Sequence, residues 1–152
     1  MLQSVHRERP PPARVIKALL LLLSLLAVAA SAQAAAPLRL ALVIGNAAYP
    51  EPADLPNPVR DAEAMAQALD RLGFNATVLR NASGDAMRSA IADFGRRLRG
   101  REGIALLYYA GHAVQIDWRN YMLPVDARID SADDVRLQGV DLALALSTLR
   151  SA

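Results

Sequence analysis

The feature that most constrains the fold is an alternation between apolar runs of strand length and amphipathic stretches of helix length. Strand-like runs at 38–44, 74–79 and 104–109 are separated by segments at 59–72 and 85–98, whose apolar residues recur at helical spacing. Such a βαβαβ order predicts a mostly parallel sheet with helices on both faces and right-handed crossovers. The sequence therefore predicts an α/β domain.

Both segments are expected to be helices, although different residues indicate this in each. The first follows a proline-rich loop at 49–58, and Gly73 stands where a helix terminator is expected. Its apolar positions are Ala62, Met65, Ala66, Leu69 and Leu72. In the second, one stripe holds Met87, Ile91, Phe94 and Leu98. The run Ile104–Tyr109 is apolar throughout, as a strand buried on both faces requires, and is expected to be central in the sheet.

The remainder of the chain predicts a hairpin and a final helix. Short runs at 113–116 and 121–125, joined by the polar residues 117–120, are expected to form a hairpin beside the sheet. Residues 141–149 are expected to be helical, with Asp141 near the helix N-terminus, where a negative charge is favourable. The leucines expected to face inward are Leu142, Leu146 and Leu149.

Residues 1–34 have the layout of a secretory signal peptide. Basic residues precede an apolar run at 18–30, and small residues follow it, which is the pattern that export machinery and signal peptidase recognise. Cleavage is expected after Ala34, with Ala32 as the second choice. The alternative is an uncleaved membrane anchor. The rest of the chain is therefore expected to be periplasmic or secreted, or membrane-anchored if the leader is retained.

Composition and charge exclude several classes of function. The 152 residues contain no Cys, so disulfides, a thiolate metal site and a thiol nucleophile are all absent from this sequence. Residues 35–152 hold 13 basic and 14 acidic residues, a net charge of −1, and no nucleic-acid binding is expected. Gly45 stands outside any phosphate-binding glycine pattern, and neither a cofactor nor a metal site is expected.

His112 is the residue with the clearest chemical potential. It directly follows the apolar run 104–109, at the carboxyl end of a predicted strand, where ligands bind in such folds. An imidazole there can act as a general acid or base near neutral pH. The alternative is a loop histidine that only forms hydrogen bonds with the backbone.

Four sequence pieces resemble a known family. They are Leu42–Tyr49 (LVIGNAAY), Asp61-Ala62, Tyr108–His112 (YYAGH) and Asn120–Asp126 (NYMLPVD). Together, and in this order, they resemble the caspase-like cysteine peptidases (peptidase C14), in particular the bacterial metacaspase-type members. The resemblance covers 38–149. It implies that residues 35–152 form part of a caspase-like catalytic domain, truncated before its fourth strand.

The resemblance also implies roles for two neighbouring residues. His112 matches the family's catalytic histidine, which works with a cysteine that follows the fourth strand. That cysteine lies about 50 residues after the histidine, so it is expected near position 162 and this chain is expected to be inactive alone. Ala113 stands where the family usually has a glycine whose backbone N–H binds the oxyanion. Alanine serves there if its φ is negative and is strained if φ is positive.

Substrate preference is implied by Asp61, which matches an acidic residue that metacaspases use to bind Arg or Lys before the cleaved bond. Arg60 beside it suggests an acidic substrate instead, and Asp61 otherwise only caps its helix. Asp117 and Asp126 are expected to be turn and loop residues. Tyr108 and Tyr109 are expected mainly to pack.

The expected partner is a peptide or protein substrate, and membrane contact is expected only through an uncleaved leader. Without a fourth strand, the sheet would present an apolar edge that pairs with another chain and leaves the protein marginally stable. The alternative function is therefore a non-catalytic binding or scaffold module of caspase-like fold. A hydrolase that uses His112 with aspartates lacks a recognisable nucleophile or metal cluster.

Overall fold

The computed structural model describes Arg14, Lys17, residues 37–50 and residues 53–150. The chain divides into two units, Met1–Ala36 and Pro37–Ala152. Apart from Arg14 and Lys17, the predicted leader and its cleavage sites lie outside the described residues. None of the helices in the described part is long and apolar enough to span a bilayer.

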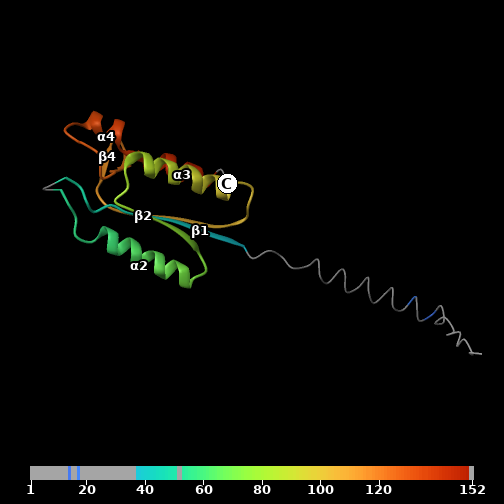
Figure 1. Cartoon of the computed structure of the whole chain (residues 1–152). Coiled ribbons are helices and arrows are strands. Elements are labelled where there is room, and N and C mark those ends of the chain that lie inside the picture. The colour runs from blue at the N-terminus through green and yellow to red at the C-terminus, as the bar shows by residue number, and fades with distance from the viewer. Residues whose placement is uncertain (1–13, 15–16, 18–36, 51–52, 151–152) are drawn as a thin grey trace, which may run out of the picture. The chain divides into compact units, whose positions relative to one another are not determined.

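The second unit is built on a three-stranded parallel sheet. Its strands are β1 (Leu38–Gly45), β2 (Asn75–Arg80) and β3 (Gly103–Ala110), in the order β2-β1-β3. The helix α2 (Pro58–Arg71) covers one face, and α3 (Gly84–Leu98) with α5 (Leu142–Arg150) covers the other (Figure 1). The predicted α/β architecture with helices on both faces is confirmed.

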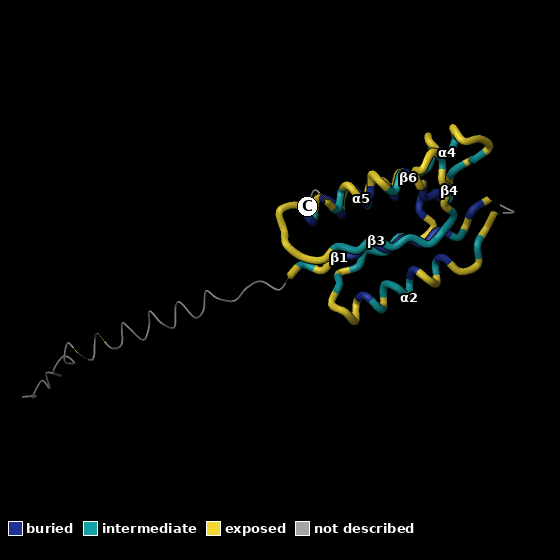
Figure 2. The backbone as a smooth tube through the Cα atoms, turned by 180° about the vertical axis from the view of Figure 1, so that it is seen from behind, coloured by how far each residue is buried: buried dark blue, intermediate teal, exposed yellow. Residues whose placement is uncertain are grey.

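β1 carries the core of both layers. Its side chains alternate, so Ala41 and Val43 pack with Ala62 and Leu69 of α2, while Leu42 and its neighbours on the same face pack against α3. Residues 40–44 are each at most 2% exposed. Figure 2 shows the buried backbone running through the middle of this unit.

The two crossover helices begin and end close to the predicted residues. Gly73, with φ of 78°, follows the end of α2 as expected, because only glycine adopts this conformation without strain. Leu72 is 59% exposed, so its assignment to the apolar stripe is corrected: the helix ends at Arg71, before the stripe would recur. On α3 the predicted stripe is buried, and the Ser83 hydroxyl caps the helix by accepting from Ala86 N.

β3 is an edge strand, which corrects the prediction that it is central. Among the described residues it pairs only with β1, from Leu38↔Gly103 to Gly45↔Ala110. Ile104 is 51% exposed, and the rest of the predicted run is half-buried. The run is apolar because both of its faces meet helices, and face coverage does not reveal whether an edge is paired.

The hairpin is tighter than predicted. β4 (Ala113–Ile116) and β5 (Arg119–Met122) are joined by Asp117 and Trp118 alone, with φ of 48° and 64°. Two positive φ values are the signature of a two-residue hairpin turn whose twist matches its strands, so β5 begins at residue 119 and not at 121. A third antiparallel strand, β6 (Val140–Asp141), pairs with β5.

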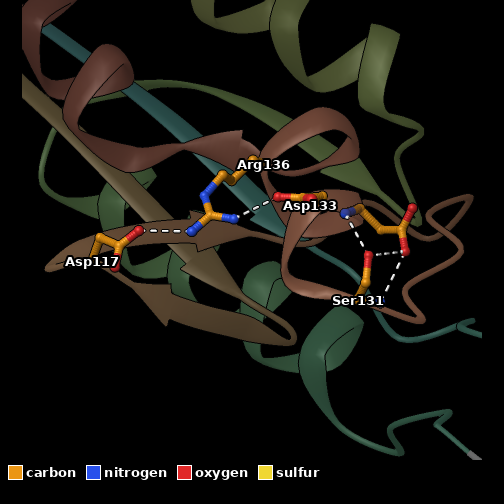
Figure 3. A network of polar contacts seen from close by, with 5 residues as sticks. Asp117, Ser131, Asp133 and Arg136 are labelled. Atoms are coloured by element: carbon orange, nitrogen blue, oxygen red, sulfur yellow. Dashed lines mark hydrogen bonds and ion pairs between the residues drawn. The ribbon is translucent and has the colours of Figure 1, made fainter.

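A short helix, α4 (Ala132–Gln138), was not predicted. Ser131 and Asp134 form a capping box at its start, and hydrogen bonds from the Ser131 hydroxyl and the Asp130 N–H lower the pKa of Asp134. Arg136 bridges Asp133 and the turn residue Asp117, each at 2.7 Å (Figure 3). The ion pairs thus join α4 to the hairpin.

The last helix, α5, forms where it was predicted, but its buried face differs from the prediction at Leu146. The carboxylate of Asp141 accepts from Ala143 N at 2.8 Å, as expected for a residue at the helix N-terminus. Leu146 is 37% exposed, which corrects its assignment as inward. The buried line of α5 runs instead through Ala145, and Thr148 packs against Gly95 of α3 so closely that a Cβ on Gly95 would collide with it.

Candidate active site at the carboxyl ends of the strands

Gly111 and His112 follow β3 at the carboxyl edge of the parallel sheet. Gly111 has φ of 157°, and a Cβ at this position would lie 2.6 Å from the Tyr109 hydroxyl oxygen and 2.7 Å from that of Tyr49. Only glycine lets both hydroxyls approach the backbone this closely. The local sequence therefore brings two tyrosines against the histidine.

The backbone of His112 is held on both sides by these hydroxyls. Its N–H donates to Tyr49 Oη at 3.0 Å, and its carbonyl accepts from Tyr109 Oη at 2.8 Å. Leu123 N also donates to that carbonyl at 2.9 Å. Both hydroxyls in addition lie within 2.9 Å of the Leu123 carbonyl. The segment after β1, the end of β3 and the residue after β5 are thus tied together at this one residue.

Tyr109 does more than pack, which corrects the prediction for it. Burial, followed by the hydrogen bond with the Tyr49 hydroxyl, raises the pKa of Tyr109 far above its ordinary value. Its hydroxyl therefore remains a neutral donor. Tyr108 points to the other face of the sheet and packs on the α2 side, as expected.

Asn46 and Tyr49 are site residues that the sequence analysis did not single out. Asn46 is fully buried directly after β1; its Oδ1 accepts from Ala82 N at 2.9 Å and its Nδ2 donates to the Leu123 carbonyl at 3.2 Å. The signal in the sequence was a polar amide side chain directly after a strand whose residues 40–44 are all apolar. A buried amide must satisfy its hydrogen bonds, so such a residue marks a junction of chain segments.

The imidazole of His112 is oriented by one hydrogen bond and one ring contact. Nε2 lies 2.6 Å from the Ala53 carbonyl oxygen, and the ring centroid is 4.6 Å from that of Tyr49. Because a carbonyl can only accept, Nε2 carries the proton and Nδ1 is the basic nitrogen. The two readings of His112 are therefore compatible: one nitrogen bonds the backbone and leaves the other available for chemistry.

A cavity of about 540 Å³ opens beside the histidine. His112 and Ala113 line it together with Tyr49, Leu123 and Pro124. Ala113 is not among the non-glycine residues with positive φ, so the strained alternative for alanine at this position does not apply. The backbone of β4 thus continues from the histidine without distortion.

Asp61 and Arg60 lie apart from this cavity. Both are exposed in the first turn of α2, and neither lines it. The N-cap residue, Asn57, makes no side-chain capping bond, so Asp61 is the charge that favours this helix terminus. Among the described residues, the charged ones that line the cavity are Arg128 and Asp130, on a loop that carried no recognisable motif.

The described residues that line the cavity include an imidazole and backbone groups but no Cys, Ser or Thr. The sequence as a whole has no Cys. The described part of the chain also holds no group of three or more His, Asp or Glu arranged to bind a metal ion. Any peptide-bond cleavage at this cavity would need a nucleophile from elsewhere.

Comparison with known proteins places these features in a family. Residues 38–145 match the model of the caspase domain, peptidase C14. The human mucosa-associated lymphoid tissue lymphoma translocation protein 1 is 35% identical over 89 residues, and its mouse homolog is 34% identical over the same length. These matches cover 59% of this chain and 11% of each relative, so the chain spans about a tenth of their length. This chain belongs to the caspase-domain family of peptidases, peptidase C14.

Proposed function

We propose that this chain contributes the histidine part of the active site of a metacaspase-type cysteine endopeptidase. The observation that carries the proposal is the 2.6 Å contact between His112 Nε2 and the Ala53 carbonyl, at the edge of a cavity. The contact fixes the tautomer in which Nδ1 accepts a proton. The position of the ring beside the cavity supports the proposal, because a substrate in the cavity would lie next to the histidine.

In the proposed reaction, the thiol comes from sequence that follows this chain. His112 Nδ1 takes the thiol proton, and the thiolate attacks the carbonyl carbon of the scissile peptide bond. The imidazolium then gives its proton to the leaving amine as the C–N bond breaks. Water hydrolyses the resulting thioester and regenerates the thiol.

Ala113 is suited to bind the oxyanion through its backbone. Leu123 N donates to the His112 carbonyl, and paired residues in an antiparallel ladder alternate between hydrogen-bonded and non-hydrogen-bonded pairs. The next pair, Ala113 with Met122, therefore leaves the Ala113 N–H pointing away from β5. A free N–H beside the base is the donor that a tetrahedral intermediate requires.

The test is to extend the chain through its downstream reading frame and to assay peptide reporters that end in Arg or in Asp. We expect the extended chain to cleave, His112→Ala to abolish cleavage, and Tyr108→Phe, on the opposite face of the sheet, to leave it unchanged. A cysteine-containing, folded chain that cleaves neither reporter would contradict the proposal. The 152-residue chain alone should show no thiol-dependent activity.

Substrate charge depends on which carboxylate binds the residue before the cleaved bond. The resemblance favours a basic residue bound by Asp61, whereas Asp130 is the carboxylate that lines the cavity. Comparing Asp61→Asn with Asp130→Asn on the Arg reporter separates the two. We expect the variant at the residue that binds the substrate to raise KM for the Arg reporter and the other variant to leave it unchanged.

A second candidate function is a non-catalytic module that binds a partner strand along β3. The open edge of β3 and the lack of a cysteine favour it, because an unpaired strand edge offers a row of backbone donors and acceptors. Failure of the extended chain to cleave, together with a stop codon directly after residue 152, would support this function.

The proposed location is outside the cytoplasm, after export by the leader. We expect processing to leave Ala35 as the first residue, or Gln33 if the second site is used. The mass of the mature protein distinguishes these, and an unprocessed chain that stays in the membrane fraction would identify an anchor instead.

A further inference from the structure

Charge is sorted between the two ends of the parallel sheet. The amino end, where the three strands begin and the helices finish, gathers seven arginines and three acids. These are Arg39, Arg71, Arg96, Arg97, Arg99, Arg101 and Arg150, with Asp70, Asp93 and Glu102. The remaining described residues from 37 onward hold six arginines and ten acids. The amino end is therefore positive by four charges, although the domain as a whole is close to neutral.

The topology explains why these arginines converge. In a parallel βαβ arrangement, the helix C-termini lie at the same edge as the strand N-termini. Leu38 N bonds the Glu102 carbonyl at 3.2 Å, and Arg39 bonds the Leu72 carbonyl at 2.6 Å, which joins the β1 start to both helix ends. The contact of Thr148 with Gly95 brings the end of α5 to the same place, and both views of the backbone agree (Figures 1 and 2).

The two ends also differ in how their arginines are neutralised. Of the six arginines in the rest of the domain, four form ion pairs with described residues, at Arg80, Arg88, Arg119 and Arg136. Of the seven at the amino end, only Arg96 does so, with Asp93. The side chains of Arg39 and Arg97 bond neutral oxygens, and the structure gives the side chains of Arg71, Arg99, Arg101 and Arg150 no bond within the described residues. Six positive charges therefore remain without a carboxylate partner.

Helix ends account for only part of this cluster. Cations at a helix C-terminus are stabilised by the helix dipole, which explains Arg71, Arg97 and Arg150. Arg39 lies on β1, and Arg99 and Arg101 lie beyond the last residue of α3, exposed on the loop to β3. The helix dipoles do not account for the positive charge of these three residues. The cluster as a whole is therefore suited to bind an anionic partner.

We propose that this arginine-rich end rests on an anionic phospholipid surface. The chain itself favours a bilayer over other anions: β1 begins here, and only residues 31–37 separate it from the apolar run of the leader. Seven extended residues reach at most about 25 Å, so this end is close to the headgroups while the leader is still in the bilayer, before cleavage after Ala34. Basic groups beside a membrane segment bind anionic lipid.

This surface would keep the domain at the membrane after the leader is cleaved, and it does not depend on the proposed peptidase activity. His112 lies at the opposite edge of the sheet, so a domain that rests on its amino end leaves the candidate active site facing away from the lipid. Substrates in the aqueous space would then reach the cavity.

The test uses the mature chain, which begins at Ala35, so that the leader cannot itself bring the domain to the lipid. It is mixed with vesicles of phosphatidylglycerol or of phosphatidylcholine, each containing a quencher attached to the lipid headgroup. The chain lacks cysteine, so Leu72→Cys, at a 59% exposed position, carries one fluorescent label at the arginine-rich end. Trp118, the only tryptophan and 91% exposed on the hairpin, reports on the other end. We expect quenching at 72 and not at 118, in phosphatidylglycerol only, and its loss in high salt.

Matched variants assign the effect to particular charges. Arg99→Gln with Arg101→Gln should weaken the lipid-contact equilibrium on the order of 25-fold, at about fivefold per arginine. Arg60→Gln with Arg128→Gln removes two exposed arginines outside the cluster and should leave the lipid-contact equilibrium unchanged. Circular dichroism would establish that both variants are folded.

Three results with vesicles would overturn the proposal, and a fourth would come from DNA binding. The first is no quenching at 72 in phosphatidylglycerol; the second is equal quenching in phosphatidylcholine; the third is equal loss in both double variants. Quenching of Trp118 would assign lipid contact to the hairpin instead. Tight binding of single-stranded DNA with the same dependence on Arg99 and Arg101 would indicate a general polyanion surface, and would also overturn the assignment to lipid.

Discussion

β1 and β3 are neighbouring eight-residue strands of similar apolar composition, yet their environments differ sharply. Residues 40–44 of β1 are each at most 2% exposed. In β3, Gly103 and Ile104 are exposed, Ile104 by 51%, and the residues from 105 to 110 are half-buried. β1 has a partner on each side, and β3 pairs only with β1 among the described residues. An apolar run therefore indicates that helices cover both faces of a strand. It does not indicate whether the edges of that strand are paired.

The two strands also divide their roles along the chain. β1 supplies the core for both layers, and β3 carries Tyr109 and leads directly to His112, which lines the cavity. The strand that is less well covered is thus the one that carries the candidate chemistry. Variants on the two strands can test this difference in burial.

The largest effect should come from shortening one leucine on each strand. Leu42→Ala removes a side chain that is 1% exposed and should lower the free energy of unfolding by about 4 kcal/mol, because it leaves a cavity that neighbours cannot fill. Leu107→Ala, on the half-buried β3, should cost only about 1–2 kcal/mol. Urea unfolding monitored by circular dichroism measures both. Equal losses would show that β3 is as well covered as β1.

A smaller effect is expected from the tyrosine pair of β3. Tyr109→Phe removes the donor to the His112 and Leu123 carbonyls and should cost about 1–2 kcal/mol of unfolding free energy. Tyr108→Phe is the matched control, since the structure gives its hydroxyl no bond within the described residues, and should be within about 0.5 kcal/mol of the parent. If the two variants were equally stable, the hydroxyl network would contribute nothing to stability.

Alkaline pH should separate β3 from β1 in a further way. Tyr109 has a folded-state pKa above its unfolded value of about 10. Its contribution to stability is therefore complete below pH 10 and is lost as the pH rises above it, since the unfolded chain gives up the proton first. Urea midpoints at pH 8 and above pH 10 should fall less in Tyr109→Phe than in Tyr108→Phe. β1 contributes nothing to this change, because its only ionisable residue is Arg39.

The smallest effect on stability should come from charging the open edge. Ile104→Lys is expected to alter the free energy of unfolding by less than about 0.5 kcal/mol, because the side chain is already half exposed. It should nevertheless reduce self-association, since an edge lysine discourages strand pairing between molecules. Sedimentation velocity over a concentration series measures this, with Leu144→Lys on α5 as the control. Equal reduction in both would point to general solubility and away from the edge.

Local sequence signals predicted some elements almost to the residue. Helical spacing and Gly73 located α2 and its end, and the stripe from Met87 to Leu98 located the buried face of α3. These signals succeed because side-chain periodicity and backbone freedom are properties of a few neighbouring residues. The turn was harder: Asp117-Trp118 is a two-residue hairpin loop, and a tryptophan at positive φ gives no glycine signal.

The candidate site was only partly predictable. His112 could be singled out because it follows an apolar strand, and the motifs around it indicated the caspase-domain family. Asn46, Tyr49 and the Ala53 carbonyl could not be connected to it, because they come together from segments some 60 residues away. Asp61 shows the reverse case, a residue that a motif suggested and that does not line the cavity.

Short-range sequence patterns were sufficient to predict the order of the three parallel strands with the helices α2, α3 and α5, the family, and the position of the histidine. The tertiary structure decided which strand is central, which nitrogen of His112 is basic and how the arginines gather at one end. These depend on how the βαβ crossovers bring distant residues together. Edge pairing, hydrogen-bond partners and charge clustering are properties of that arrangement, and no single segment carries them.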